Sequence, residues 1–280
     1  MEEKKIQWHP AFTAAMELEL AESRENLIFE KEYNLNTKPL ELDLLVIKKE
    51  NDAEIKNEIG KFFRKHNIME YKSPRDSLDI DVLYKVLGYA CLYKSYGKTL
   101  DAVKAEDVTV SLVRHTKPQK LFRHLKEKGI NYRKYADGIF YLEGLVFPVQ
   151  ILITREIGKK EHTWLRSLSE NMDTEEMTAL VNAIGRLEEP YDKELADSVF
   201  QVSIQANREI MELLKESDTM CQALLEIMEP EIREREAISE ARGEIRGAIS
   251  TLLKLGYSNE EVISALQKSL EITEEQAEKY

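Results

Sequence analysis

Three charged side chains stand inside two segments whose other residues are mostly apolar. Asp43 lies within residues 42–47. Glu70 and Lys72 lie within residues 67–72. Carboxylates hold hard divalent cations such as Mg²⁺ through their oxygens, and a bound cation lowers the pKa of a water and neutralises charge on a phosphate. A nearby lysine can orient that water or stabilise the transition state. Two carboxylates and one ammonium at one end of a sheet would therefore suit phosphodiester hydrolysis.

The same two segments predict strands that position these groups. Residues 40–47 predict a buried strand with apolar residues on both faces, and residues 67–72 predict a strand that ends at a Ser-Pro pair. Alternate side chains of a strand share a face, so Glu70 and Lys72 point the same way. A lone carboxylate in a buried strand is strongly disfavoured unless it is paired or bound to a metal. Two adjacent central strands could place Asp43 beside Glu70 and Lys72. The alternative is that Glu70 and Lys72 form a solvent-facing ion pair on an edge strand.

The rest of the chain predicts an α/β region followed by helices. The expected elements are a helix over residues 9–23, strands over 27–33, 40–47 and 67–72, a helix over 79–96, a strand over 108–113, a helix over 119–128, and strands over 138–143 and 149–154. From residue 162 onward the pattern is helical. The chain therefore predicts a domain over residues 1–156 with a mixed sheet flanked by helices, and an all-helical extension over residues 157–280.

The net charge of −12 is concentrated toward one end of the chain. Residues 187–280 hold 22 acidic and 10 basic side chains, whereas residues 1–186 hold 30 of each. The global charge therefore does not argue against an N-terminal region that binds phosphate, and the asymmetry suggests two regions with different roles. The acidic helices favour a regulatory role or homo-oligomer formation. A mimic of DNA that covers the basic surface is the sharper alternative.

A resemblance to a known family adds to this interpretation. Its parts are residues 8–12 and 18–20, residues 42–47, residues 67–74, and then Asp81, Tyr84, Lys85 and residues 88–90. They resemble the PD-(D/E)XK nuclease superfamily, and within it the bacterial proteins described as Rpn-type recombination-promoting nucleases or transposase-like proteins. The run Asn-Ile-Met-Glu-Tyr-Lys-Ser-Pro is the most specific part. The likeness covers about residues 8–155 and continues more loosely into the helical tail.

The resemblance implies a fold, a metal site and an activity. The implied fold is a restriction-endonuclease-like core with the order αβββαβ, followed by the helical extension. Asp43 matches the metal-binding Asp, with Leu42 in place of the usual Pro, and Glu70 and Lys72 match the (D/E)XK pair. Glu19 matches the first-helix Glu that often completes the metal site. The implied activity is endonucleolytic cleavage of DNA, linked to recombination or mobile elements, with Mg²⁺ or Mn²⁺ as cofactor.

The first-helix metal ligand and the catalytic activity each have an alternative. Glu17 and Glu22 lie on the same predicted helix as Glu19 and compete with it for the metal. The fold could also persist in a catalytically silent interaction module, because fold does not guarantee activity. The intact motif favours a working site. RNA is an alternative substrate to DNA.

Basic residues after the motif are candidates for contacts with phosphate. In many nucleases of this superfamily the helix after the motif supplies an auxiliary polar residue, for which Lys85 is the candidate. Residues 114–128 are basic, and Lys117, Lys120 and Arg123 would give salt-sensitive, sequence-blind affinity for nucleic acid. The alternatives are a helix that packs its tyrosines into the core, and a solvated face on the second helix.

Other classes of protein and cofactor find no support in the sequence. We read neither a signal peptide nor an apolar stretch of membrane length, and we expect a soluble, cytoplasmic protein with no membrane partner. Cys91 and Cys221 are far apart and typical of structural thiols in a reducing compartment. The sequence has no Walker loop, GxGxxG or HExxH pattern, so we expect no zinc, nucleotide or flavin.

Overall fold

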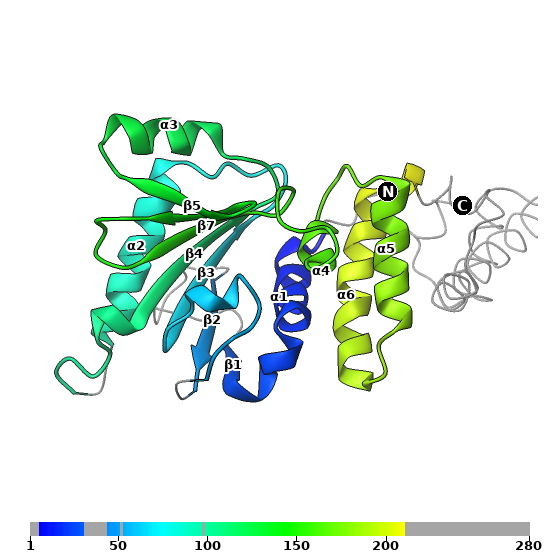
Figure 1. The fold of residues 1–280 in the computed structure, drawn as a ribbon, viewed down its shortest axis with the longest axis horizontal. Coiled ribbons are helices and arrows are strands. Elements are labelled where there is room, and N and C mark those ends of the chain that lie inside the picture. The colour runs from blue at the N-terminus through cyan, green and yellow to red at the C-terminus, as the bar shows by residue number, and fades with distance from the viewer. Residues whose placement is uncertain (1–5, 31–43, 51–52, 97–98, 211–280) are drawn as a thin grey trace, which may run out of the picture. The chain divides into compact units, whose positions relative to one another are not determined.

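A seven-stranded mixed sheet is the centre of the computed structural model (Figure 1). The structure describes residues 6–30, 44–50, 53–96 and 99–210. Its strands are β1 (Leu27–Glu30), β2 (Leu44–Lys49), β3 (His66–Lys72), β4 (Val108–Arg114), β5 (Tyr132–Ala136), β6 (Ile139–Leu142) and β7 (Val149–Ile153). Its helices are α1 (Trp8–Glu19), α2 (Ile80–Ser95), α3 (Gln119–Glu127), α4 (Thr163–Arg166), α5 (Thr174–Gly185) and α6 (Pro190–Ala206), with 3₁₀ turns η1 (Ala21–Asn26), η2 (Gly60–Phe62) and η3 (Ala105–Asp107).

The topology of the sheet places β3 and β4 in its interior. The strand order is β1-β2-β3-β4-β7-β6-β5. β3, β4 and β7 run parallel to one another, whereas β1 with β2, β2 with β3, β5 with β6, and β6 with β7 pair antiparallel. Parallel strands inside a sheet are covered on both faces, which explains why β7 is buried along its whole length and β4 along all but its last residue. The carboxyl ends of β3, β4 and β7 therefore meet at one edge, called here the carboxyl edge.

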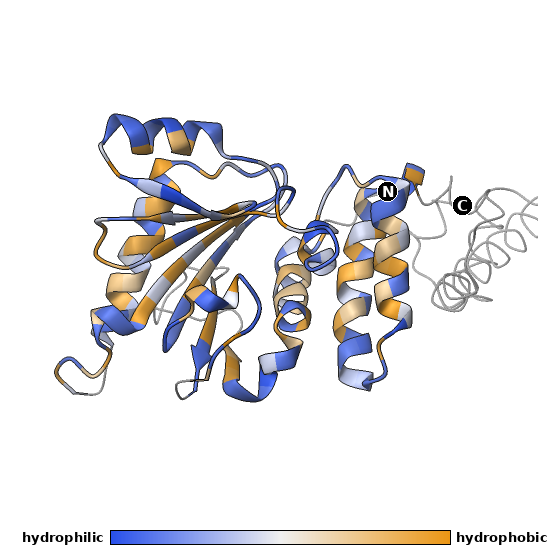
Figure 2. Ribbon diagram, in the orientation of Figure 1, coloured by the Kyte–Doolittle hydropathy of each residue, from blue (hydrophilic) through white to orange (hydrophobic). Residues whose placement is uncertain are grey.

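Helices cover both faces of the sheet. On one face Ile68 and Leu112 pack in a core with residues of α2 and α3, among them Leu83 and Leu121. On the other face Tyr71 stacks on Phe12 of α1, with ring centroids 4.6 Å apart. Figure 2 shows the central strands as largely hydrophobic and α3 as mostly hydrophilic, because α3 buries one stripe only. The alternation along β3 thus sends neighbouring residues into two different cores.

The helices that follow the sheet pack on α1. The Tyr191 hydroxyl of α6 donates a hydrogen bond to Glu17 of α1, and Arg24 forms an ion pair with Asp192 at 2.6 Å. All the described residues belong to one compact unit. The helices α4, α5 and α6, which lie in the predicted extension 157–280, are therefore part of the same unit as the sheet.

The prediction of a mixed α/β fold with helices on both faces of the sheet is confirmed. The expected order of helix, three strands, helix and strand is observed over residues 8–114. The first helix is shorter than the predicted 9–23, because the chain tightens into η1 after Leu20. One strand, β5, was not expected. No helix in the described part of the chain is long and apolar enough to cross a bilayer.

Candidate active site

Glu70 and Lys72 form an ion pair on β3. The Lys72 Nζ lies 2.6 Å from the Glu70 Oε1, and the two side chains are 19% and 7% exposed, respectively. Both residues share the sheet face of Ile68, which α2 and α3 cover, while Tyr71 points to the opposite face. The structure therefore brings these two predicted site residues together. It also excludes the edge-strand alternative, because β3 lies between β2 and β4 and the Glu70 carboxylate is buried.

The buried side chain of Leu112 lies beside Glu70. Leu112 is the neighbour of Glu70 in register on β4, and the backbone of Leu44 pairs with Glu70 from β2. A buried carboxylate needs a compensating charge, and Lys72 is the cation that contacts it in the described part of the chain. Asp43, the third predicted residue, lies outside the described residues. It directly precedes Leu44 in the sequence.

The turn after β3 is fixed by Arg114 at the end of β4. Arg114 is the neighbour of Lys72 in register, and its guanidinium donates to the carbonyls of Asp76, at 2.9 Å, and Pro74, at 3.4 Å. Burial lowers the pKa of Arg114, although the charge of Asp76 opposes this. The Ser73 hydroxyl also donates to the Asp76 carboxylate at 2.7 Å. The Ser-Pro pair of the motif thus begins a turn that sets where β3 ends.

Asn67 is the most completely bonded polar residue of the motif. Its amide nitrogen donates to the carbonyls of Ile47, at 2.9 Å, and Arg64, at 2.7 Å. Its amide oxygen accepts from the Arg64 N–H, at 2.8 Å, and from the Thr109 hydroxyl, at 2.6 Å. Because these partners lie on β2, on the approach to β3 and on β4, the fully buried Asn67 ties together the strands that present Glu70. This role was not inferred from the sequence.

Glu19 is held by the segment around α4. Its Oε2 lies 2.9 Å from the His162 Nδ1, its Oε1 accepts from the Leu165 N–H at 3.2 Å, and its side chain is 1% exposed. Burial lowers the pKa of His162, but the hydrogen bond and charge of Glu19, with Glu58 and Glu161, outweigh it and the pKa is raised.

The first-helix carboxylates are not grouped with Glu70 in the described residues. No hydrogen bond or ion pair joins Glu19 to Glu70 there, and those residues contain no cluster of three or more His, Cys, Asp or Glu side chains that could hold a metal. Of the two competitors, Glu17 is buried against α6 and Glu22 is exposed in η1.

The four basic candidates lie on or beside α2 and α3. Lys85, Lys120 and Arg123 are exposed. The Lys85 Nζ lies 5.5 Å from the centroid of the Tyr89 ring of its own helix. The Lys117 Nζ lies 5.2 and 5.1 Å from the Phe122 and Phe140 ring centroids, so cation–π contacts fix it beside the same core that covers Glu70.

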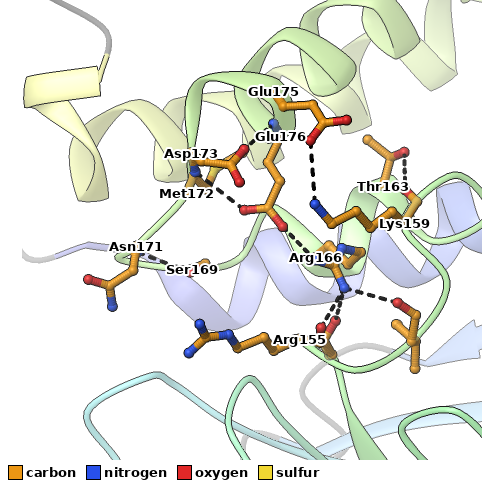
Figure 3. Close-up of polar contacts among 12 residues, drawn as sticks. Arg155, Lys159, Thr163, Arg166, Ser169, Asn171, Met172, Asp173, Glu175 and Glu176 are labelled. Carbon is orange, nitrogen blue, oxygen red and sulfur yellow. Dashed lines mark hydrogen bonds and ion pairs between the residues drawn. The ribbon is translucent and has the colours of Figure 1, made fainter.

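A polar network that the sequence patterns missed braces the carboxyl edge (Figure 3). Arg166 donates to the carbonyls of Arg155, at 2.6 Å, and Ile157, at 2.9 Å, and pairs with Glu176 at the start of α5. Glu176 also completes a capping box with Asp173. The network joins the segment after β7 to α5.

His115 adds a second brace at the same edge. Its Nδ1 lies 3.1 Å from the Thr154 hydroxyl and its Nε2 lies 3.0 Å from the Ser169 hydroxyl. Burial, with the charge of Arg155, lowers the pKa of His115 to about 4. A neutral, buried histidine of this kind positions backbone segments and offers no charge to a phosphate.

No protein-family model matches this chain, and it has no significant match among curated proteins or solved structures.

Proposed function

We propose that the protein is a metal-dependent endonuclease that hydrolyses DNA, built on a restriction-endonuclease-like core of the PD-(D/E)XK type. The observation that carries this proposal is the buried Glu70–Lys72 pair on an interior strand. A buried ion pair is weak as a device for stability, because desolvation of the two charges offsets their attraction. A catalytic role for the two charged groups would explain why this buried ion pair is present.

The topology supports the same proposal. Helix, three strands, helix and strand follow in the order expected of this core. Glu70 and Lys72 occupy the carboxyl half of β3, near the edge at which parallel strands present ligand sites. Leu44, the neighbour of Asp43 in the chain, pairs with Glu70.

The residues present suit a divalent cation. Glu70 is a buried carboxylate beside the buried Leu112, and hard oxygen donors of this kind suit Mg²⁺ or Mn²⁺. Asp43 and Glu70 would hold the cation, which supplies charge neutralisation and a more acidic water when bound. Lys72 compensates the charge of Glu70 and can orient the attacking water by a hydrogen bond. The apolar contacts of α2 and α3 keep bulk water from this side of β3.

Cations on and beside α3 support a polyanionic substrate. Lys120 and Arg123 are exposed on α3, Lys117 is half-buried just before that helix, and Arg155 is exposed at the carboxyl edge. These side chains would contribute contacts to the phosphate backbone, which position a nucleic acid without reading its bases.

Cleavage with controlled metal content tests the proposal. Full-length protein would be incubated with single- and double-stranded DNA and RNA, in Mg²⁺ or in chelator, beside Asp43→Ala. We expect internal cleavage of DNA in Mg²⁺, none in chelator and none with Asp43→Ala. Full activity of a folded Asp43→Ala protein would reject the proposal, and cleavage of RNA alone would replace the substrate.

The second candidate function is a catalytically silent interaction module on the same fold. The engagement of Glu19 by His162 and Leu165 favours it, because this carboxylate is taken up by structure and not left for a metal. Calorimetric titration with Mn²⁺ separates the two candidates. Binding by the native protein that is lost in Asp43→Ala supports the nuclease, and no binding supports the silent module.

A further inference from the structure

A groove of about 450 Å³ lies toward the end of β3 opposite to that of Lys72. Its side chains come from η2 and the residue pair after it, from β5, from β6 and from the segment between β6 and β7. The six that matter are Lys61, Phe62, Arg64, Arg133, Tyr135 and Tyr141. β3 begins at His66, two positions after Arg64. Glu70 lies four positions further along the strand than His66, a distance of about 13 Å. Tyr141 also shares its sheet face with Gln150 and Ser111, the face opposite to that of Glu70. The groove is therefore separate from the candidate active site.

Three aromatic rings form a column in this groove. Phe62 packs on Tyr141 with centroids 4.6 Å apart, and Tyr141 stacks on Tyr135 with centroids 4.7 Å apart and an interplanar angle of 15°. Tyr135 is 41% exposed, and no second ring among the described residues packs on it. The column thus ends at Tyr135, on a half-exposed ring that can take another planar group.

Cations surround the column. The Arg133 guanidinium carbon lies 5.0 Å from the Tyr141 ring centroid, and its Nε lies 3.3 Å from Glu143. Lys61 is exposed and forms no ion pair within the described ranges, and exposed Arg64 donates to the carbonyl of Glu106. The lining holds three cations and one carboxylate in a chain of net charge −12. Burial and Tyr135 raise the pKa of Tyr141 to about 12, so its phenol adds no negative charge at neutral pH.

We propose that this groove binds unpaired nucleotides, with a base stacked on Tyr135 and the backbone phosphates on Arg133, Arg64 and Lys61. Every base has a planar π face that can extend a ring column, and arginine and lysine pair with phosphate. Bases of a duplex are already stacked on one another, so a single strand fits better than a duplex. An acidic peptide would meet the cations but would leave Tyr135 unused. The inference is independent of hydrolysis at Glu70.

The charges on β5 have a second explanation that does not account for the rings. β5 is an edge strand, and lysine and arginine on such a strand discourage pairing with another chain. That purpose requires neither a ring column nor a groove beside it. Tyr132, on the other face of β5, instead packs against Phe122 and Phe140 of the core.

Fluorescence anisotropy of labelled oligonucleotides in chelator tests the inference on the full chain. We expect the single strand to bind more tightly than the duplex of the same length. Tyr135→Ala should weaken the single strand about tenfold, as expected for loss of one stacked base, whereas Tyr135→Phe keeps the native affinity. Arg133→Gln should lower the slope of log affinity against log salt by about 0.7, the loss of one phosphate contact. The matched control is Tyr132→Ala, on the same strand and 40% exposed, which should keep native affinity.

Three outcomes would overturn the inference. These are native affinity in both Tyr135→Ala and Arg133→Gln, an equal loss in Tyr132→Ala, or displacement of the strand by polyglutamate as readily as by an unlabelled oligonucleotide. Binding of either a deoxyribo- or a ribo-oligonucleotide supports it, and the ratio of the two affinities identifies the sugar preferred. Binding is measured in chelator, which prevents metal-dependent cleavage. A failed cleavage assay therefore does not affect the test of nucleotide binding by the groove, and a failed binding assay does not affect the test of cleavage at Glu70.

Discussion

Removal of the Asn67 amide should destabilise the sheet at the strands that carry the candidate site. Asn67 is fully buried and makes four hydrogen bonds of 2.6–2.9 Å, to the carbonyls of Ile47 and Arg64, the N–H of Arg64 and the hydroxyl of Thr109. Asn67→Ala deletes all four and leaves the partner groups buried without a replacement.

The size of the loss follows from these bonds. A net contribution of about 1 kcal/mol per hydrogen bond gives a cost of about 4 kcal/mol in the free energy of unfolding. A change of this size lowers Tm by about 10 °C in a chain of this length. Thr109→Val removes only the hydroxyl that donates to Asn67 and should cost about 1 kcal/mol.

Urea unfolding of the native protein, Asn67→Ala, Thr109→Val and the double variant measures these terms. The double variant should be less destabilised than the sum of the single variants by about 1 kcal/mol, because the two side chains share one bond. The reasoning is refuted if Asn67→Ala costs no more than Thr109→Val, or if the two costs add.

Three further expectations concern protonation and metal. His115 has its pKa lowered to about 4, so the unfolded chain binds more protons between pH 6.5 and 4, and stability should fall by about 3 kcal/mol as pH drops through this range. Urea midpoints of His115→Gln should lack this slope, and an unchanged slope would contradict the assignment. His162 has a raised pKa, so its contribution to the free energy of unfolding is present below pH 6.5 and is lost as pH rises through the raised value. Glu19→Gln should abolish this contribution, and an NMR titration of the His162 ring would show the loss of the raised pKa. Mg²⁺ at a hundred times its Kd should stabilise the native protein by about 2.7 kcal/mol in thermal melts and Asp43→Asn not at all, while equal stabilisation of both would place the cation elsewhere.

Strong periodicity explains which parts of the fold were predictable. The strand of Glu70 and Lys72, the helix that follows it and the order of the first elements come from alternation, helical spacing and turn residues, which are local signals. β5 was missed because its residues are almost all exposed, so it has no apolar alternation. A signal was present nonetheless, since Asp137-Gly138 is the two-residue turn of a hairpin and Gly138 has φ +70°.

The candidate site was predictable only where it is local. The contact between Glu70 and Lys72 follows from a spacing of two on one strand. The engagement of Glu19 by His162, the bonds of Asn67 to β2 and β4, and the bracing by His115 join residues far apart in the chain. A sequence pattern gives their residue types but not their partners, because such partners are set by tertiary packing.

Comparison of Glu70→Gln with Glu30→Gln tests the proposed site most directly. Both variants remove a carboxylate that pairs with a lysine on the same sheet, and Glu30 on β1, two strands from β3, pairs with Lys48 at 2.5 Å. Cleavage of labelled DNA in Mg²⁺ would be measured for both and for the native protein, with folding checked by circular dichroism. We predict that Glu70→Gln loses at least a hundredfold in rate, about 2.7 kcal/mol or more of transition-state stabilisation, while Glu30→Gln retains the native rate. Equal rates in the two folded variants would contradict a catalytic site at Glu70.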